Sequence, residues 1–364
     1  MESLKRKPEE LEKLHYDVLE GRSDYIPLVI RIRPKESGIF GGIKNISPWD
    51  GMKNPSEYLE VFLENNKENM RLPTDRVITI ESNFVESLIP TMFGANITKA
   101  PGGIIEVKPF AESMEELLNI NIINGQLDEA KEHLTYLKEN IPDDVHLSMT
   151  RFMSPLDYGV VMRGGEFYMD LLCEPELCME FMEKVADLSI KVTKEFKAIL
   201  NEPYDKMVTA ATGFWFHGTR LTGDSIVNVS PDVIKNMLCP VFDKYKKELG
   251  GVMLHYCCTP APSGHVLPTL AECDSVRCVD NWQGVDTYFD EAGTGRLQDK
   301  ISMFADFPIE EVSDIDKFLS RDIFSKVKRK GGRGFVVRTD AENIDEAARL
   351  YEKWREYFEK KNIN

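Results

Sequence analysis

The sequence lacks any apolar run that approaches the length of a membrane-spanning helix, and its first residues are charged, without the apolar segment of a signal peptide. It also lacks a basic excess, because 45 lysines and arginines stand against 61 aspartates and glutamates, a net charge of −16. Nucleic acids and anionic membranes attract basic surfaces. We therefore expect a cytoplasmic protein with neither nucleic acid nor membrane as a partner.

Two further features are missing. The cysteines are odd in number, seven, and unevenly placed, which argues against a disulfide framework and for a reducing compartment. No glycine-rich phosphate loop follows a predicted strand, since the run from Gly38 to Gly42 lacks the spacing of a dinucleotide-binding motif. An open, doubly wound sheet of the nucleotide-binding type is therefore disfavoured.

What the sequence does contain is a regular alternation of strand and helix patterns. Nearly every predicted strand precedes a helix, as in a barrel of eight parallel strands. This pattern predicts the α/β class and a (β/α)8 TIM barrel, one domain over residues 23–364 after an N-terminal helical extension over residues 1–22. The strands are expected at 24–33, 76–81, 145–153, 205–211, 251–257, 275–280, 300–304 and 334–338, and the main helices at 54–70, 109–140, 175–199, from 230, 309–328 and after a capping box at 339–342.

One strand carries two side chains typical of metal sites. The apolar run from Gly251 ends at His255 and Cys257, before a Pro-rich loop. Residues two apart in a strand face the same side, so the imidazole and the thiolate can converge on a soft metal such as zinc. A hydrogen-bonded histidine next to a small buried cysteine is the alternative interpretation.

Other polar residues are predicted at strand ends, where barrel enzymes place their chemistry. Glu81 and Asn83 are expected there as substrate contacts or as capping groups, and His217 as an acid or base or as a surface histidine. Trp215 is expected in a pocket wall or in the core. Further polar residues expected at these ends are Arg31, Arg33, Asp280, Asn281, Asp306 and Arg338.

Several motifs, in the expected order, resemble the uroporphyrinogen decarboxylase superfamily, whose members include tetrapyrrole decarboxylases and corrinoid-linked methyltransferases. The resemblance implies the same (β/α)8 barrel. The motifs are Ser154-Pro155-Leu156-Asp157 with Arg163-Gly164-Gly165-Glu166, Gly223-Asp224-Ser225, Gly250-Gly251 through His255-Tyr256-Cys257, and Thr339 with Glu342-Asn343-Ile344.

The methyltransferase branch is the closer one, because His255 and Cys257 match its H-x-C zinc motif, whereas the decarboxylase motif R-Q-A-G-R is absent near Arg31. The branch's distant cysteine ligand falls near Arg333 and is missing. A third ligand would then come from another side chain. The candidates are Cys258, Cys273, Cys278, Glu81 and Asp280, of which Asp280 is favoured because it lies at a neighbouring strand end.

The resemblance implies that a methyl group moves from a small methylated donor to a corrinoid protein, with zinc assisting. A homodimer is also possible by analogy. The catalytic residues would be His217, Asp224 and Glu81, with Asp224 orienting a group of the site or capping a turn. The substrate-binding residues would be Arg31, Arg33, Asn83, Trp215, Asn281 and Arg338.

Two alternatives remain open at this point. One is a metal-free decarboxylase of a tetrapyrrole or other polycarboxylate, with Arg31, Arg33 and Arg338 binding carboxylates. The other is a non-catalytic protein that binds a corrinoid or a tetrapyrrole.

Overall fold

The computed structural model describes residues 5–32, 45–257, 264–280, 297–308, 314–321 and 333–360. Its centre is a seven-stranded parallel sheet, which confirms the α/β class. Two further strands, β2 (Thr79–Glu81) and β5 (His146–Ser148), pair in parallel beside it. The order of the large sheet is β1 (Leu28–Ile32), β13 (Phe335–Ala341), β12 (Ser302–Phe307), β11 (Val276–Asp280), β10 (Val252–His255), β9 (Thr219–Thr222) and β6 (Phe152–Met153).

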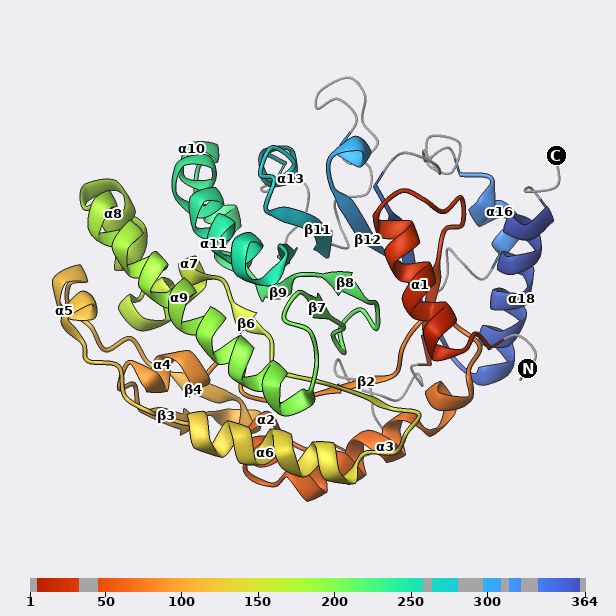
Figure 1. The fold of residues 1–364 in the computed structure, drawn as a ribbon, viewed down its shortest axis with the longest axis horizontal. Coiled ribbons are helices and arrows are strands. Elements are labelled where there is room, and N and C mark those ends of the chain that lie inside the picture. The colour runs from red at the N-terminus through yellow and green to blue at the C-terminus, as the bar shows by residue number, and fades with distance from the viewer. Residues whose placement is uncertain are drawn as a thin grey trace.

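Helices surround these strands, and the long ones form an outer arc (Figure 1). In α9 (Pro175–Leu200) the apolar residues recur every three or four positions, so that one stripe of the helix is fully buried. The other long helices are α3 (Pro55–Arg71), α6 (Leu127–Asn140), α11 (Cys239–Leu249) and α18 (Ile344–Lys360). Shorter helices are α2 (Pro48–Lys53), α4 (Leu88–Met92), α5 (Met114–Asn119), α7 (Pro155–Arg163), α8 (Glu166–Cys173), α10 (Pro231–Val233), α13 (Val266–Leu270) and α16 (Ile315–Leu319). Within the described ranges, every helix is too short or too polar to cross a membrane.

The first helix, α1 (Pro8–Leu19), is tied to the body of the protein through a buried histidine. His15 Nε2 lies 2.9 Å from the backbone oxygen of Asp75, and the backbone N–H of Trp215 donates to Nδ1 at 3.0 Å. Both ring nitrogens are therefore satisfied only in the neutral form. Complete burial lowers the pKa of His15 to about 3. The extension is thus held by specific polar contacts as well as by its apolar face.

The strand predicted over residues 205–211 is shorter than expected and lies outside the main sheet, and a strand of the main sheet was not predicted. Residues 205–211 contain only β7 (Lys206–Met207), which pairs antiparallel with β8 (Phe216–His217), while the strand of the main sheet is β9 (Thr219–Thr222). The sequence Thr-Arg-Leu-Thr places an arginine inside a buried strand, which a pattern based on apolar residues does not favour. Only the tertiary partner of Arg220 makes this position tolerable.

Two helix boundaries also differ from the prediction. The segment 109–140 is broken into α5 and α6, because Gly125 has a left-handed φ of +54° and a Cβ there would lie 2.6 Å from the backbone of Thr91. At the C-terminal end, Thr339 still belongs to β13, so the cap is made four residues later by Asn343, which accepts from the N–H of Glu346 at 3.0 Å. Of the helix expected over 309–328, the described residues contain α16.

Candidate metal site

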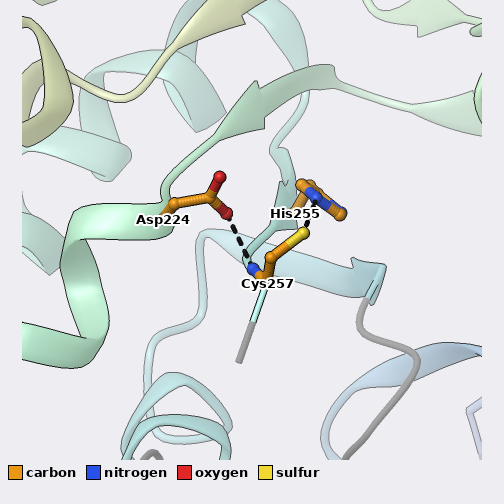
Figure 2. A group of neighbouring side chains, drawn as sticks. All are labelled: Asp224, His255 and Cys257. Carbon is orange, nitrogen blue, oxygen red and sulfur yellow. Dashed lines mark hydrogen bonds between the residues drawn. The ribbon is translucent and has the colours of Figure 1, made fainter. Parts of the chain in front are cut away.

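Three side chains with metal-binding atoms meet at the carboxyl ends of two adjacent strands (Figure 2). Asp224 follows β9, His255 is the last residue of β10, and Cys257 comes two residues later. One donor atom from each residue lies within 4.8 Å of the others. Because β9 and β10 are parallel, with Thr222 opposite His255, their carboxyl ends lie side by side at the same end of the sheet.

The backbone at this edge holds the group together. The N–H of Gly223 donates to the carbonyl oxygen of His255 at 2.7 Å, which continues the pairing of the two strands by one residue. The N–H of Cys257 then donates to Oδ1 of Asp224 at 2.7 Å. Asp224 and Cys257 are both exposed, whereas the side chain of His255 is 20% exposed. Backbone hydrogen bonds therefore fix the positions of the three residues, and the side chains of Asp224 and Cys257 are accessible to solvent.

The orientation of the His255 ring is fixed by the neighbouring strand. Its Nδ1–H donates to the backbone oxygen of Asp280 at 2.8 Å, and its Nε2 lies 2.8 Å from Sγ of Cys257. Burial disfavours the charged ring, but the interactions with Asp280 and Cys257 outweigh burial and raise the pKa of His255 to about 9. Without a metal, the ring is therefore protonated at neutral pH, and Nε2 is the nitrogen available to a ligand.

The donor set fits zinc. Imidazole nitrogen, thiolate sulfur and carboxylate oxygen are its usual ligands, at about 2.0–2.3 Å, so that tetrahedral donors lie roughly 3.3–3.8 Å apart. The Nε2 of His255 and the Sγ of Cys257, at 2.8 Å, would have to separate by about 1 Å or less to reach this range. Three protein ligands leave a fourth position free, which is typical of catalytic zinc sites and not of structural ones.

Asp280 does not supply the third donor that we expected. Its side chain is buried, with Arg220 Nη2 2.9 Å from Oδ2 and Arg338 Nη2 2.5 Å from Oδ1. Burial opposes ionisation of this carboxyl group, but Arg338, His255 and Arg220 hold its pKa well below the usual range. Asp280 thus stands behind the His255 ring, and the carboxylate at the front is that of Asp224. Asp224 was predicted to orient a group of the site, and it was missed as a ligand because β9 was not predicted.

Most of the predicted substrate-binding and catalytic residues near this edge are already paired. Glu81 binds Arg151 and accepts the N–H of Ala210 at 2.7 Å. Arg338 also donates to Asp306, at 2.9 Å from Nε. Arg31 pairs with Asp340 at 2.9 Å, and Asn83 donates to the backbone oxygen of Pro48 at 2.9 Å. Arg33, Cys258 and Asn281 lie outside the described residues.

His217 and Trp215 are not brought to the cluster. His217 precedes the amino end of β9, stacks on Tyr16 at 4.4 Å and lies 3.6 Å from both Glu20 and Asp205. The ring of Trp215 packs edge-on against His146 at 4.7 Å. His217 therefore contacts α1 near the amino end of β9, whereas Asp224 follows the carboxyl end of that strand. The backbone N–H of Trp215 also contacts α1, through His15.

The position expected for the missing cysteine ligand is also remote. Arg333 precedes the amino end of β13 and lines a cavity of about 560 Å³ together with His217, Gly250 and Arg277. Gly250 and Arg277 likewise lie at or near the amino ends of their strands, so this cavity is at the opposite end of the sheet from His255. A side chain at position 333 could not complete the site.

No model of a known protein family and no curated protein matches this sequence. The resemblance drawn from the motifs therefore stays a prediction.

Proposed function

We propose that this chain is a zinc-dependent enzyme that transfers a methyl group from a small methylated donor to a corrinoid carried by a partner protein. The observation that carries the proposal is the convergence of Asp224, His255 and Cys257 at the open edge of a parallel sheet. The resemblance of the motifs around Asp224 and His255 to the methyltransferase branch of the uroporphyrinogen decarboxylase superfamily adds the type of reaction.

The proposal includes closure of the strands into a (β/α)8 barrel. In its favour, β5 and β6 are separated by only three residues of one chain segment, and they pair with β2 and β9 respectively. The segment before β2 also bonds to β1, since the N–H of Asp75 donates to the oxygen of Leu28 at 3.1 Å. Closure would place all strand ends, and the polar residues on them, around one mouth.

Each protein group would have a defined task. Asp280 would hold the proton on Nδ1 of His255, which leaves Nε2 for the metal. Asp224 would bind through the oxygen that the Cys257 N–H does not engage. Bound zinc would act as a Lewis acid on the atom that carries the methyl group. The bond from that atom to the methyl carbon would break and leave its electron pair with the demethylated product, while the reduced cobalt(I) corrinoid of the partner would supply the electron pair of the new cobalt–carbon bond.

The alternative of a metal-free decarboxylase receives less support. Two of its expected carboxylate-binding residues, Arg31 and Arg338, are paired with carboxylates of the chain itself. A substrate carboxylate would have to displace Asp340 or Asp306 from them. No described contact distinguishes an enzyme from a non-catalytic protein that binds a corrinoid or a tetrapyrrole. An assay of methyl transfer distinguishes the two, because only the enzyme turns over.

The test is metal content together with ligand replacement. The full chain is stripped with chelator, reloaded with zinc and analysed by elemental analysis, with about one equivalent expected. Cys257→Ser, His255→Ala and Asp224→Asn should each weaken zinc binding by at least tenfold. Methyl transfer from a panel of methylated oxygen, nitrogen and sulfur compounds to a free corrinoid, chemically reduced to cobalt(I), should require zinc.

Cys173→Ser is the matched control, because Cys173 is an exposed cysteine at the end of α8, outside the cluster. It should bind zinc as the natural chain does. Less than about a tenth of an equivalent after reloading, or equal losses from Cys173→Ser and Cys257→Ser, contradicts the proposal.

A further inference from the structure

Arg220, which contacts Asp280 next to the candidate metal site, is buried with some of its N–H donors unpaired among the described residues. Arg220 lies on β9 and is 3% exposed. Its Nη2 donates to Asp280 at 2.9 Å, but its Nε and Nη1 have no hydrogen-bond partner among the described residues. A buried charged donor without an acceptor costs considerable free energy, so such a group calls for an explanation.

Arg151, the residue before β6 on the strand that neighbours β9, has the same feature. It pairs with Glu81, and its Nε is likewise buried without an acceptor in the described structure. Phe152 lies opposite Leu221 in the sheet, so Arg151 and Arg220 occupy neighbouring positions on adjacent strands. Burial lowers the pKa of Arg220, Asp280 and Glu81 oppose this, and the positive charge of Arg151 lowers it further. Glu81 and Asp280 each neutralise one of these guanidinium groups, but three of their buried N–H donors still lack an acceptor among the described residues.

Arg338, which also contacts Asp280, has an acceptor for each of its three nitrogens. Arg338 uses Nε and Nη2 on Asp306 and directs Nη1 toward the oxygen of Ala211 at 3.4 Å. The described residues therefore provide acceptors for all three nitrogens of Arg338, but for only one of the three nitrogens of Arg220. Arg220 is also adjacent to the candidate metal ligands, because the same Asp280 that it contacts holds the His255 ring.

We propose that the free donors of Arg220, with Arg151 beside it, bind a carboxylate group of the substrate, so that the metal site acts on a small acid and not on a neutral molecule. A carboxylate is the acceptor that a guanidinium binds most strongly through paired hydrogen bonds. This inference rests on the proposed function for what happens at the metal, but not for the binding of the acid.

The experiment compares acids with their amides. Binding of acetate and benzoate is measured by calorimetry against acetamide and benzamide, on the full chain at neutral pH, both with zinc and after chelator treatment. At least one acid should bind tenfold or more tightly than its amide. Arg220→Met should bring the two within about twofold, and Arg220→Lys, which keeps the charge but not the planar fork, should lose at least threefold of the preference.

Arg277→Met is the matched control, since Arg277 is an exposed arginine at the amino end of β11. It should keep the full preference for acids. Acids and amides that bind alike, or a preference that survives Arg220→Met, overturns the inference. The preference for acids measured without zinc tests Arg220 separately from the metal site. A preference for acids in a chain that binds no zinc contradicts only the proposed metal site, and zinc binding without this preference contradicts only the role of Arg220.

Discussion

His255 and Asp280 are joined twice across neighbouring strands. The ring Nδ1–H of His255 donates to the backbone oxygen of Asp280 at 2.8 Å, and the Asp280 carboxylate lies 3.5 Å from the same nitrogen. This arrangement resembles the outer contacts that orient zinc-binding histidines in known sites, where the partner of the ring fixes which nitrogen binds the metal.

Asp280→Asn should weaken zinc binding by about 10- to 100-fold, because it removes the negative charge beside the ring while the three candidate ligands remain. Competition with a chromophoric chelator measures the affinity. Asp306→Asn is the control, since Asp306 also pairs with Arg338, whereas the described contacts of the His255 ring are with Asp280 and Cys257. It should change the affinity by less than about threefold. Equal losses in the two variants would show that the network acts only through general stability.

Protonation of His15 should destabilise the protein in mild acid. The folded-state pKa of about 3 lies below the ordinary value of 6.5, so the contribution of neutral His15 is complete above pH 6.5 and is lost as the pH falls toward 3. The free energy of unfolding should then fall by up to about 1.4 kcal/mol per pH unit from this residue. Urea unfolding at pH 7, 6 and 5 measures it.

The control for this prediction is His15→Gln, which cannot titrate. Asp157 has a pKa raised to about 6 by burial, and it therefore contributes a pH dependence of opposite sign, but it does so in both proteins. The difference between the two unfolding curves isolates His15. Parallel curves from pH 7 to 5 would contradict the assignment.

Gly218→Ala should destabilise the start of β9. Gly218 has a φ of +129°, and a Cβ there would lie 2.3 Å from the backbone oxygen of Gly251, just before β10. The strands would have to move apart at the point where their register begins, at a cost of about 3 kcal/mol. Thermal and urea unfolding measure this loss.

Gly94→Ala is the matched control for the position of the clash. Gly94 also has a left-handed φ, +87°, but a Cβ there would meet nothing within 4 Å. It should cost only about 1 kcal/mol, the price of the backbone conformation alone. A loss in Gly94→Ala as large as in Gly218→Ala would show that backbone strain dominates at both positions.

Much of the fold could be predicted from local patterns. The strand that ends at His255, the strand that ends at Asp280 and the helix capped by Asn54 were all expected within a few residues of where they lie. Their apolar runs and capping residues are contiguous in the sequence. The strand over 219–222 was missed because its inward residue, Arg220, is stabilised by Asp280, a partner 60 positions away.

The sequence by itself predicted that His255 and Cys257 converge, from the two-residue period of a strand. In the structure β10 ends at His255, and the backbone after the strand, held by the bond from the Cys257 N–H to Asp224, brings the two side chains together. Only the tertiary structure decided that Asp224, 33 positions before Cys257, joins them and that Asp280 contacts the far side of the ring. It also decided that two donors of Arg220 have no acceptor among the described residues. These outcomes depend on the register between parallel strands. That register is set by the packing of the whole sheet, so it cannot be predicted from the sequence of a single strand.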